Sequence, residues 1–249
     1  MRILLSLLLL LAICVVAPTV CADETAAPTR PGYFMGRQIA PTMSYLGADW
    51  LVRTTREKEE RPDLLIAALG LERGQRVCDF GSGNGYYTLR LAPLVAPVGR
   101  VDAVELQPEM LELLAARAEA RGIENVQTVL ATDTQSGLAE RAYDLVLLVD
   151  VYHELADPAA ALAELRQSLR PTGRVALVEF RLEDPYVPIK PLHKMTQAQC
   201  LKEFRSGGLK LVGQFDRLPW QHVLFFARDD SPLAEARLVG WSGVKHDEQ

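Results

Sequence analysis

Residues 77–89 contain a short apolar run, an acidic residue and a three-glycine turn, in that order. Asp79 lies near the end of the apolar run, and Gly81, Gly83 and Gly85 follow at every second position. Glycine adopts positive φ values and lets the backbone approach a ligand more closely than any residue with a side chain allows. The segment therefore predicts a buried strand, a nucleotide-type binding turn and a helix. Because glycine turns also occur for purely structural reasons, the surrounding sequence has to support this interpretation.

Three later apolar runs also end in a carboxylate. They are residues 100–105 with Glu105, residues 126–133 with Asp133, and residues 143–150 with Asp150. Glu105 follows Gly85 by twenty residues, where a βαβ dinucleotide site places the acid that accepts hydrogen bonds from ribose hydroxyls. The third of these runs is almost wholly apolar, as in a strand buried on both faces of a parallel sheet. The sequence thus predicts four acids along one edge of a sheet.

Helical segments alternate with these runs, which favours a parallel α/β sheet in a single large domain. Proline at the start and glycine after the end mark residues 62–69 and 108–121 as helices. A third helix is expected from Asp157 to a stop at Pro171, and a fourth from Thr196 to Gly207. Residues 209–214 and 222–228 then read as two strands joined by residues 215–221.

This constellation resembles the class I S-adenosylmethionine-dependent methyltransferases over about residues 62–228. The first motif of that family, an acid followed by G-x-G-x-G, falls on residues 79–85. Residues 169–178 resemble the family's entry into its fifth strand, with Thr172 in place of a usual glycine. The resemblance implies a Rossmann-like α/β fold, with a mostly parallel seven-stranded sheet and a reversed last strand. The chain is similar to the branch of quinone-biosynthesis C-methylases and arsenite methyltransferases, without the cysteine set that arsenic requires.

The resemblance also implies a role for each acid. Glu105 would bind the ribose diol of S-adenosylmethionine, Asp133 would meet the adenine amino group, and Asp150 would begin the segment that faces the transferred methyl. The glycine loop would wrap the methionine part of the cofactor. The residues expected to bind S-adenosylmethionine are Asp79, Gly81, Gly83, Gly85, Glu105, Asp133 and Asp150.

A nicotinamide-dependent oxidoreductase is the nearest alternative, because its fingerprint also follows a strand and ends at a distant ribose acid. The spacing argues against it, since Tyr86 occupies the position of the third glycine in G-x-G-x-x-G. Charge argues against it as well, since Asp79 would repel a pyrophosphate but attract a sulfonium and an α-ammonium group. The sequence therefore favours a methyltransferase.

Methyl transfer to an acceptor that carries a proton needs a general base, and His153 is the candidate because histidine exchanges a proton near neutral pH. Tyr152 is the second predicted catalytic residue, and Glu154 is a neighbour that would help to orient the substrate. The alternatives are a structural role for His153 and catalysis by proximity alone. No metal is expected, because Asp157 replaces the second histidine of H-E-x-x-H and no cysteine pair has ligand spacing.

The ends of the chain differ in character from the middle. Residues 1–22 read as a secretory signal peptide, and their apolar run of about 14 residues is short for a membrane span, which needs roughly 20. Residues 23–60 are expected to be a linker and an N-terminal cap segment, residues 61–228 the methyltransferase domain, and residues 229–249 a loosely ordered tail. The protein is thus expected to be exported, to the periplasm, unless translation starts at Met35 or Met43 and leaves a cytoplasmic enzyme. Because the cofactor is made in the cytosol, an exported protein that keeps the fold without turnover is a further alternative.

The net charge of −5 argues against a nucleic-acid partner. Nucleic-acid binders carry a basic face, and the chain has no dense run of lysine and arginine, so a small-molecule substrate is expected. The mixed charges of residues 53–61 are interpreted as a solvated helix face with ion pairs. Residues 183–195 follow the fifth strand, where the family builds a substrate lid. Arg181, Lys190, His193 and Lys194 would grip an acidic or oxygen-rich substrate there, if this is not an ordinary surface loop.

Overall fold

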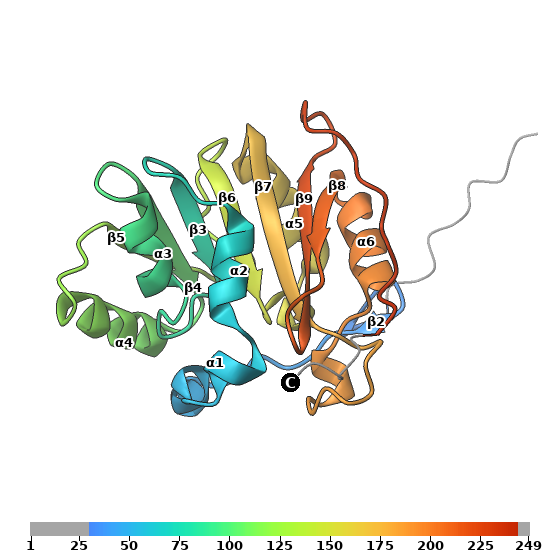
Figure 1. The fold of residues 1–249 in the computed structure, drawn as a ribbon, viewed down its shortest axis with the longest axis horizontal. Helices are drawn as coiled ribbons and strands as arrows, with labels where there is room; N and C mark the ends of the chain where they lie inside the picture. The colour runs from blue at the N-terminus through green and yellow to red at the C-terminus, as the bar shows by residue number, and fades with distance from the viewer. Residues whose placement is uncertain (1–29, 244–249) are drawn as a thin grey trace, which may run out of the picture.

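The computed structural model describes residues 30–243, so the predicted signal peptide lies outside the described residues. A seven-stranded sheet in the order β5-β4-β3-β6-β7-β9-β8 forms the centre of the molecule (Figure 1). Its strands are β3 (Arg76–Phe80), β4 (Arg100–Glu105), β5 (Val126–Leu130), β6 (Tyr143–Val149), β7 (Leu169–Phe180), β8 (Leu209–Phe215) and β9 (Gln221–Arg228).

The direction of the strands confirms the predicted fold class. The pairs β3 with β4, β3 with β6, β4 with β5 and β6 with β7 are all parallel. The last strand, β9, runs antiparallel to both of its neighbours, β7 and β8. The protein therefore has the Rossmann-like class I fold, with a mostly parallel seven-stranded sheet and a reversed last strand.

Helices cover both faces of the sheet, as Figure 1 shows for α2 in front of it and α5 behind it. The helices α2 (Pro62–Leu69) and α3 (Thr88–Val95) share one core cluster, to which β6 contributes Leu145 and Leu147. The helices α5 (Pro158–Ser168) and α6 (Gln197–Ser206) share the other cluster with Val146 and Leu148 of β6. Alternate residues of β6 are thus buried on opposite faces, which explains its unbroken apolar sequence.

The local signals in the sequence place most helix ends correctly. The side chain of Asp157 accepts a hydrogen bond from the N–H of Ala160 at the start of α5, and that of Thr196 caps α6 in the same way through Gln199. The helix α4 (Pro108–Glu119) begins at its proline and contacts β4 and β5. The expected stop of α5 at Pro171 is wrong by three residues, because β7 already begins at Leu169.

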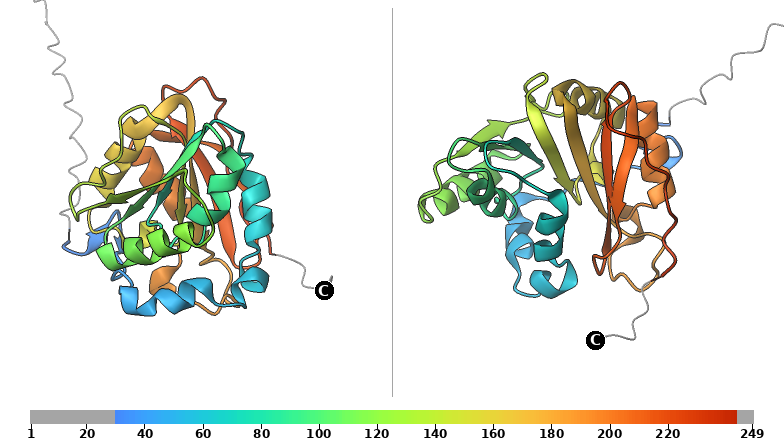
Figure 2. Two further views of the ribbon diagram at one scale, coloured as in Figure 1. Left: turned by 90° about the vertical axis from the view of Figure 1, so that its left-hand side faces the viewer. Right: turned by 45° about the horizontal axis from the view of Figure 1, so that its top comes forward.

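The segment before the sheet contains a short hairpin, β1 (Tyr33–Phe34) and β2 (Arg37–Gln38), the 3₁₀ helix η1 (Tyr45–Val52) and the short helix α1 (Arg56–Glu59). Figure 2 shows this segment in blue at the same end of the sheet as the loop after β7. Residues 229–243 form no helix or strand, but the N–H of Ala236 bonds to the carbonyl of Leu211 in β8. No helix within residues 30–243 has the length and apolar character that crossing a membrane would require.

Candidate functional site

A cavity of about 660 Å³ lies at the edge of the sheet where the parallel strands end. Phe80 and Gly81 line it after β3, Glu105 at the end of β4, Val149 at the end of β6, and Phe180 at the end of β7. Open α/β sheets bind their ligands at this edge, beside the point where the strand order reverses. Here that point lies between β3 and β6. The volume falls within the roughly 300–1,000 Å³ of small-molecule sites.

The structure brings six of the nine predicted site residues onto the wall of this cavity. They are Gly81, Gly83, Glu105, Asp133, Asp150 and His153. The other three, which do not line it, are Asp79, Gly85 and Tyr152.

Asp79 and Gly85 hold the glycine loop in place through contacts with α3 and α4. The carboxylate of Asp79 is buried and accepts a hydrogen bond of 2.5 Å from the hydroxyl of Thr88, the first residue of α3. Burial raises the pKa of Asp79 to about 6. Gly85 has φ +83, and a β-carbon there would lie 2.7 Å from Cγ of Leu114 in α4. Both residues therefore fix the turn between β3 and α3, and neither lines the cavity.

Glu105 organises the glycine loop as well as lining the cavity. Its Oε2 accepts the backbone N–H of Gly83 at 2.9 Å, and its Oε1 accepts the N–H groups of Leu106 and Gln107 at 2.8 and 3.0 Å. A carboxylate has about four lone-pair directions, so three are already in use. Glu105 therefore keeps about one acceptor direction for a ligand hydroxyl.

Asp150 stands at the end of β6 in a strained conformation. Its φ is +55, in the left-handed region that residues with a side chain rarely adopt. Its Oδ2 accepts a hydrogen bond of 2.7 Å from Nε2 of Gln221, whereas Oδ1 has no hydrogen-bond partner. Burial, followed by the nearby carboxylates of Glu60 and Glu179, raises the pKa of Asp150 well above its usual range. A cation in the cavity would give Oδ1 of Asp150 a partner. It would also reduce the repulsion between Asp150 and the carboxylates of Glu60 and Glu179.

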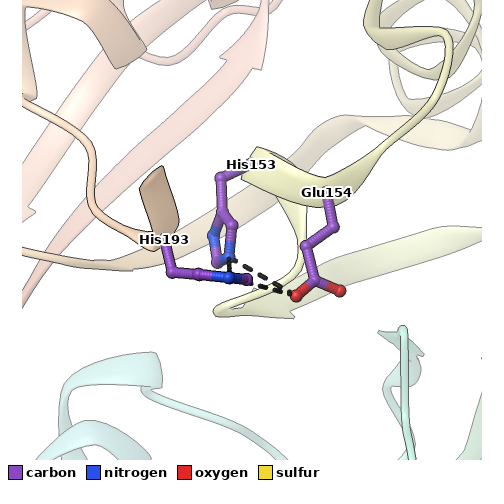
Figure 3. A group of neighbouring side chains, drawn as sticks. All are labelled: His153, Glu154 and His193. Atoms are coloured by element: carbon purple, nitrogen blue, oxygen red, sulfur yellow. Dashed lines mark hydrogen bonds and ion pairs between the residues drawn. The ribbon is translucent and has the colours of Figure 1, made fainter. Parts of the chain in front are cut away.

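His153 lies between a buried carboxylate and a second histidine. Its Nδ1 is 2.7 Å from Oε2 of Glu179 in β7, and its Nε2 is 3.1 Å from Nδ1 of His193. Burial alone would lower the pKa of His153, but the carboxylates of Glu179 and Glu154 outweigh it and raise the pKa to about 10. The pKa of His193 is lowered, first by burial and then by the charge of His153. Figure 3 shows the rings of both histidines beside Glu154.

The sequence did not point to Glu179 and gave no role to the contact between the two histidines. A signal for Glu179 exists, because it is a lone carboxylate in the otherwise apolar run of residues 175–180, and it is fully buried in β7. Tyr152 does not reach the cavity. Its buried ring packs 5.0 Å from the ring of Phe204, and the guanidinium of Arg37 lies 5.5 Å from its centroid.

The interpretation of residues 53–61 as a solvated helix face is wrong for two of its charges. Arg56 and Glu60 are 5% and 1% exposed, form an ion pair of 2.8 Å and line the cavity. The guanidinium of Arg56 also lies 4.1 Å from the centroid of the Tyr86 ring, which provides an apolar partner for this buried cation. The expected ion pairs are present, and those of Arg53 and Arg56 with Glu60 lie on the cavity wall.

Only some of the residues predicted to bind substrate in the loop after β7 line the cavity. Lys190 and His193 line the cavity with Pro188 and Ile189. Arg181 does not line it, because its buried guanidinium donates to the backbone carbonyl of Gln221 at 2.5 Å. Lys194 is also turned away, and its Nζ donates to the carbonyl of Asp184 at 3.3 Å.

The charges on the cavity wall favour a cationic ligand. Seven acidic side chains line it against three arginine and lysine side chains, and the acids stay in excess even when Asp150, whose pKa is raised, is left out and the charged His153 is added to the cations. Such a wall repels a pyrophosphate and attracts a sulfonium or ammonium group. The carboxylates are Glu60, Glu105, Asp133, Asp150, Glu154, Asp157 and Glu164, and the cations are Arg53, Arg56 and Lys190.

Comparison with known proteins agrees with this geometry. Residues 78–177 match a family model described as a methyltransferase domain. A protein-L-isoaspartate O-methyltransferase from Ignicoccus hospitalis is 29% identical over 140 residues, which are 56% of this chain and 63% of that protein. The ubiquinone/menaquinone biosynthesis C-methyltransferase UbiE of Psychromonas ingrahamii is 28% identical over 112 residues, 45% of each chain. This chain thus spans less than two thirds of the length of either relative.

A solved structure extends the likeness to most of the fold. The structure of a SAM-dependent methyltransferase from Aquifex aeolicus superposes with a TM-score of 0.70, over 74% of this chain and 98% of that one, at 20% identity. At this identity the likeness shows the fold alone. The chain therefore has the class I fold, and the match to the methyltransferase-domain model covers residues 78–177 of it. By name, one relative is a protein O-methyltransferase and the other a C-methyltransferase of ubiquinone/menaquinone biosynthesis, so they leave the acceptor of this chain open.

Proposed function

We propose that this protein transfers a methyl group from S-adenosylmethionine to a small-molecule acceptor. The observation that carries the proposal is the convergence of Gly83, Glu105 and Asp150 on one acid-lined cavity at the carboxyl edge of the sheet. The cofactor has a sulfonium and an α-ammonium group, and both suit the excess of carboxylates on the wall.

In this proposal the cofactor occupies the half of the cavity next to β3, β4 and β5. Gly81 and Gly83 let the loop backbone approach the methionine part, because no side chain stands between the backbone and the ligand. Glu105 accepts a ribose hydroxyl, and Asp133, which is exposed in the loop after β5, meets the adenine amino group. The unpartnered carboxylate oxygen of Asp150 lies on the side of the positive charges of the cofactor.

The acceptor would occupy the half next to β6, β7 and the loop with His193. Methyl transfer is an in-line displacement at a carbon activated by its sulfonium, so much of the rate can come from holding the two reactants together and excluding water. For an acceptor that must lose a proton, His153, the base suggested by the sequence, is already charged at neutral pH and cannot take a second proton. The proton would instead go to His193, whose lowered pKa keeps its ring neutral and which lies 3.1 Å from His153 on the cavity wall. His153 would then position His193.

The test is a calorimetric titration of the purified protein with S-adenosylmethionine, S-adenosylhomocysteine and NADH. The two adenosyl compounds should bind and NADH should not. Label from methyl-labelled S-adenosylmethionine should then appear in a member of a panel of hydroxyl, thiol and carbon-acid compounds. Binding of NADH alone would contradict the proposal in favour of an oxidoreductase. Cofactor binding with label only in an isoaspartyl peptide would replace the small-molecule acceptor by a protein, and no transfer to any acceptor would favour a non-catalytic protein.

We also propose that the protein is exported, on the basis of the signal-like residues 1–22. The structure offers an argument against a start at Met43. Arg37 would then be absent, although its guanidinium forms two hydrogen bonds of 2.8 and 2.9 Å to the fully buried carboxylate of Glu203. Arg37 also donates to the carbonyl of His153 at 3.0 Å, so that start would loosen the acceptor side of the cavity.

A further inference from the structure

His153, Glu154 and His193 present three ligand atoms to one point beside the cavity (Figure 3). His153 and Glu154 come from the 3₁₀ turn η2 (Tyr152–Glu154) after β6, and His193 from η3 (Pro191–His193), forty residues later. We propose that these three side chains bind a divalent cation of the zinc class. The site does not depend on the proposed function, and only its place beside the acceptor rests on it.

The distances between the ligand atoms fit such an ion. His153 Nε2 lies 3.1 Å from His193 Nδ1 and 3.7 Å from Glu154 Oε1, and His193 Nδ1 lies 3.4 Å from Glu154 Oε1. In a tetrahedral zinc site with bonds of about 2.0–2.1 Å, neighbouring ligand atoms are roughly 3.4 Å apart. The three atoms therefore already stand close to the corners of one face of a tetrahedron.

The neighbours of the three ligands hold them in the required orientation. Glu179 accepts a hydrogen bond from Nδ1 of His153 at 2.7 Å, so Nε2 of that ring is the atom that would bind a cation in place of its proton. Glu154 is held through its other oxygen, because Oε2 accepts the N–H of Met43 at 3.2 Å while Oε1 faces the histidines. A carboxylate behind a ligand histidine is the usual support of zinc sites.

The charges around the three ligands and their position on the cavity wall also suit a divalent cation. Glu154 and Glu179 supply two negative charges, which balance a divalent cation that takes the place of the proton on Nε2 of His153. All three ligand residues line the cavity, so a fourth position would face the space in which the acceptor is proposed to lie. Two histidines and one glutamate with one open position form the ligand set of a catalytic zinc site. An oxygen or sulfur atom of the acceptor would be the natural fourth ligand.

The expectation of no metal rested on the absence of H-E-x-x-H and of cysteine pairs with ligand spacing. That pattern requires both histidines on one helix, whereas the second histidine here comes from another loop. The local sequence around His153 therefore contained only two of the three ligands.

The experiment is a calorimetric titration of chelator-treated protein with Zn²⁺, with Co²⁺ as an optical probe of coordination geometry. The parent should bind one ion per chain, and the Co²⁺ form should show the intense visible absorption of four-coordinate cobalt. His193→Ala and Glu154→Gln should lose the one-to-one binding. Glu179→Gln, which removes a supporting carboxylate and not a ligand, should weaken it by roughly 10–100-fold. Glu112→Gln, on the exposed face of α4, is the matched control and should bind as the parent does.

Absence of one-to-one binding in the parent would overturn the inference, and the two histidines would then form a hydrogen-bonded pair. Unchanged binding in His193→Ala, or its loss in Glu112→Gln, would overturn it as well. S-adenosylmethionine is titrated into the same samples. Cofactor binding without Zn²⁺ binding would contradict the metal site and leave the proposed function standing, whereas Zn²⁺ binding without cofactor binding would do the reverse.

Discussion

Replacement of Glu105 by glutamine tests how the cofactor half of the site is built. Three backbone N–H groups already occupy the carboxylate, from Gly83, Leu106 and Gln107. About one acceptor direction therefore remains for a ribose hydroxyl. One hydrogen bond to a charged group contributes about 1.5–3 kcal/mol, so Glu105→Gln should raise the dissociation constant of S-adenosylmethionine by about 10- to 150-fold.

The same substitution should also weaken the free protein. A glutamine has one acceptor oxygen, so its NH₂ group must face at least one of the three N–H donors, and an unpaired buried donor costs about 1–3 kcal/mol. Urea unfolding without ligand and calorimetric titration with S-adenosylmethionine separate the two effects. Glu112→Gln, on the exposed face of α4, makes the same charge change and should alter neither. Unchanged cofactor affinity in Glu105→Gln would refute the ribose contact, and a loss far above 150-fold would mean that the loop opens on binding.

Three further predictions test other parts of the structure. Gly83→Ala should weaken cofactor binding, because a β-carbon there would lie 2.7 Å from Cδ1 of Leu51 and displace a side chain that lines the cavity, whereas Gly122→Ala carries a similar positive φ with no atom within 4 Å and should bind normally. Arg37→Ala should lower the free energy of unfolding by roughly 3–5 kcal/mol in urea titrations, because it leaves a buried carboxylate without its cation. N-terminal sequencing of protein from the native host should begin at Asp23, and a chain that begins at Met35 or Met43 would contradict export.

The parts of the fold that could be predicted are those with local causes. The glycine turn, the acids at strand ends and the helix caps each depend on residues within a few positions of one another. Parallel strands then bring their ends to one edge, so Glu105 and Asp150 reach the same cavity without any knowledge of long-range contacts. The reversed strand β9 was predictable from a resemblance to a family, and not from its own sequence.

The parts that could not be predicted depend on partners far apart in the chain. Glu179 in β7 and His193 in η3 both contact His153, although they come 26 and 40 residues later in the chain. The charges of Arg56 and Glu60 look like those of a solvated helix, because the pattern does not reveal that the segment folds over the cavity. Tyr152 follows β6 as a cavity residue would, but the 3₁₀ turn η2 directs it into the core instead.

The buried carboxylate of Asp79 makes a prediction about stability and pH. Its pKa is about 6 in the folded protein, against about 3.9 in an unfolded chain. The folded state therefore holds the proton more tightly, so the stabilisation from this group is complete below pH about 4 and is lost as the pH rises through about 6. The difference between the two values corresponds to about 3 kcal/mol.

Asp79→Asn should remove this loss, because an amide stays neutral and its oxygen can still accept the hydroxyl of Thr88. Urea unfolding of parent and variant between pH 4.5 and about 7.5 gives the comparison, and the variant should gain stability relative to the parent as the pH rises. The difference between the two curves is the relevant quantity, since the other acids titrate equally in both proteins. Asp49→Asn, at an exposed position in η1, should follow the parent. Parallel curves for the parent and Asp79→Asn would show that the carboxylate is solvated or paired, and that its burial beneath the glycine loop costs the fold nothing at neutral pH.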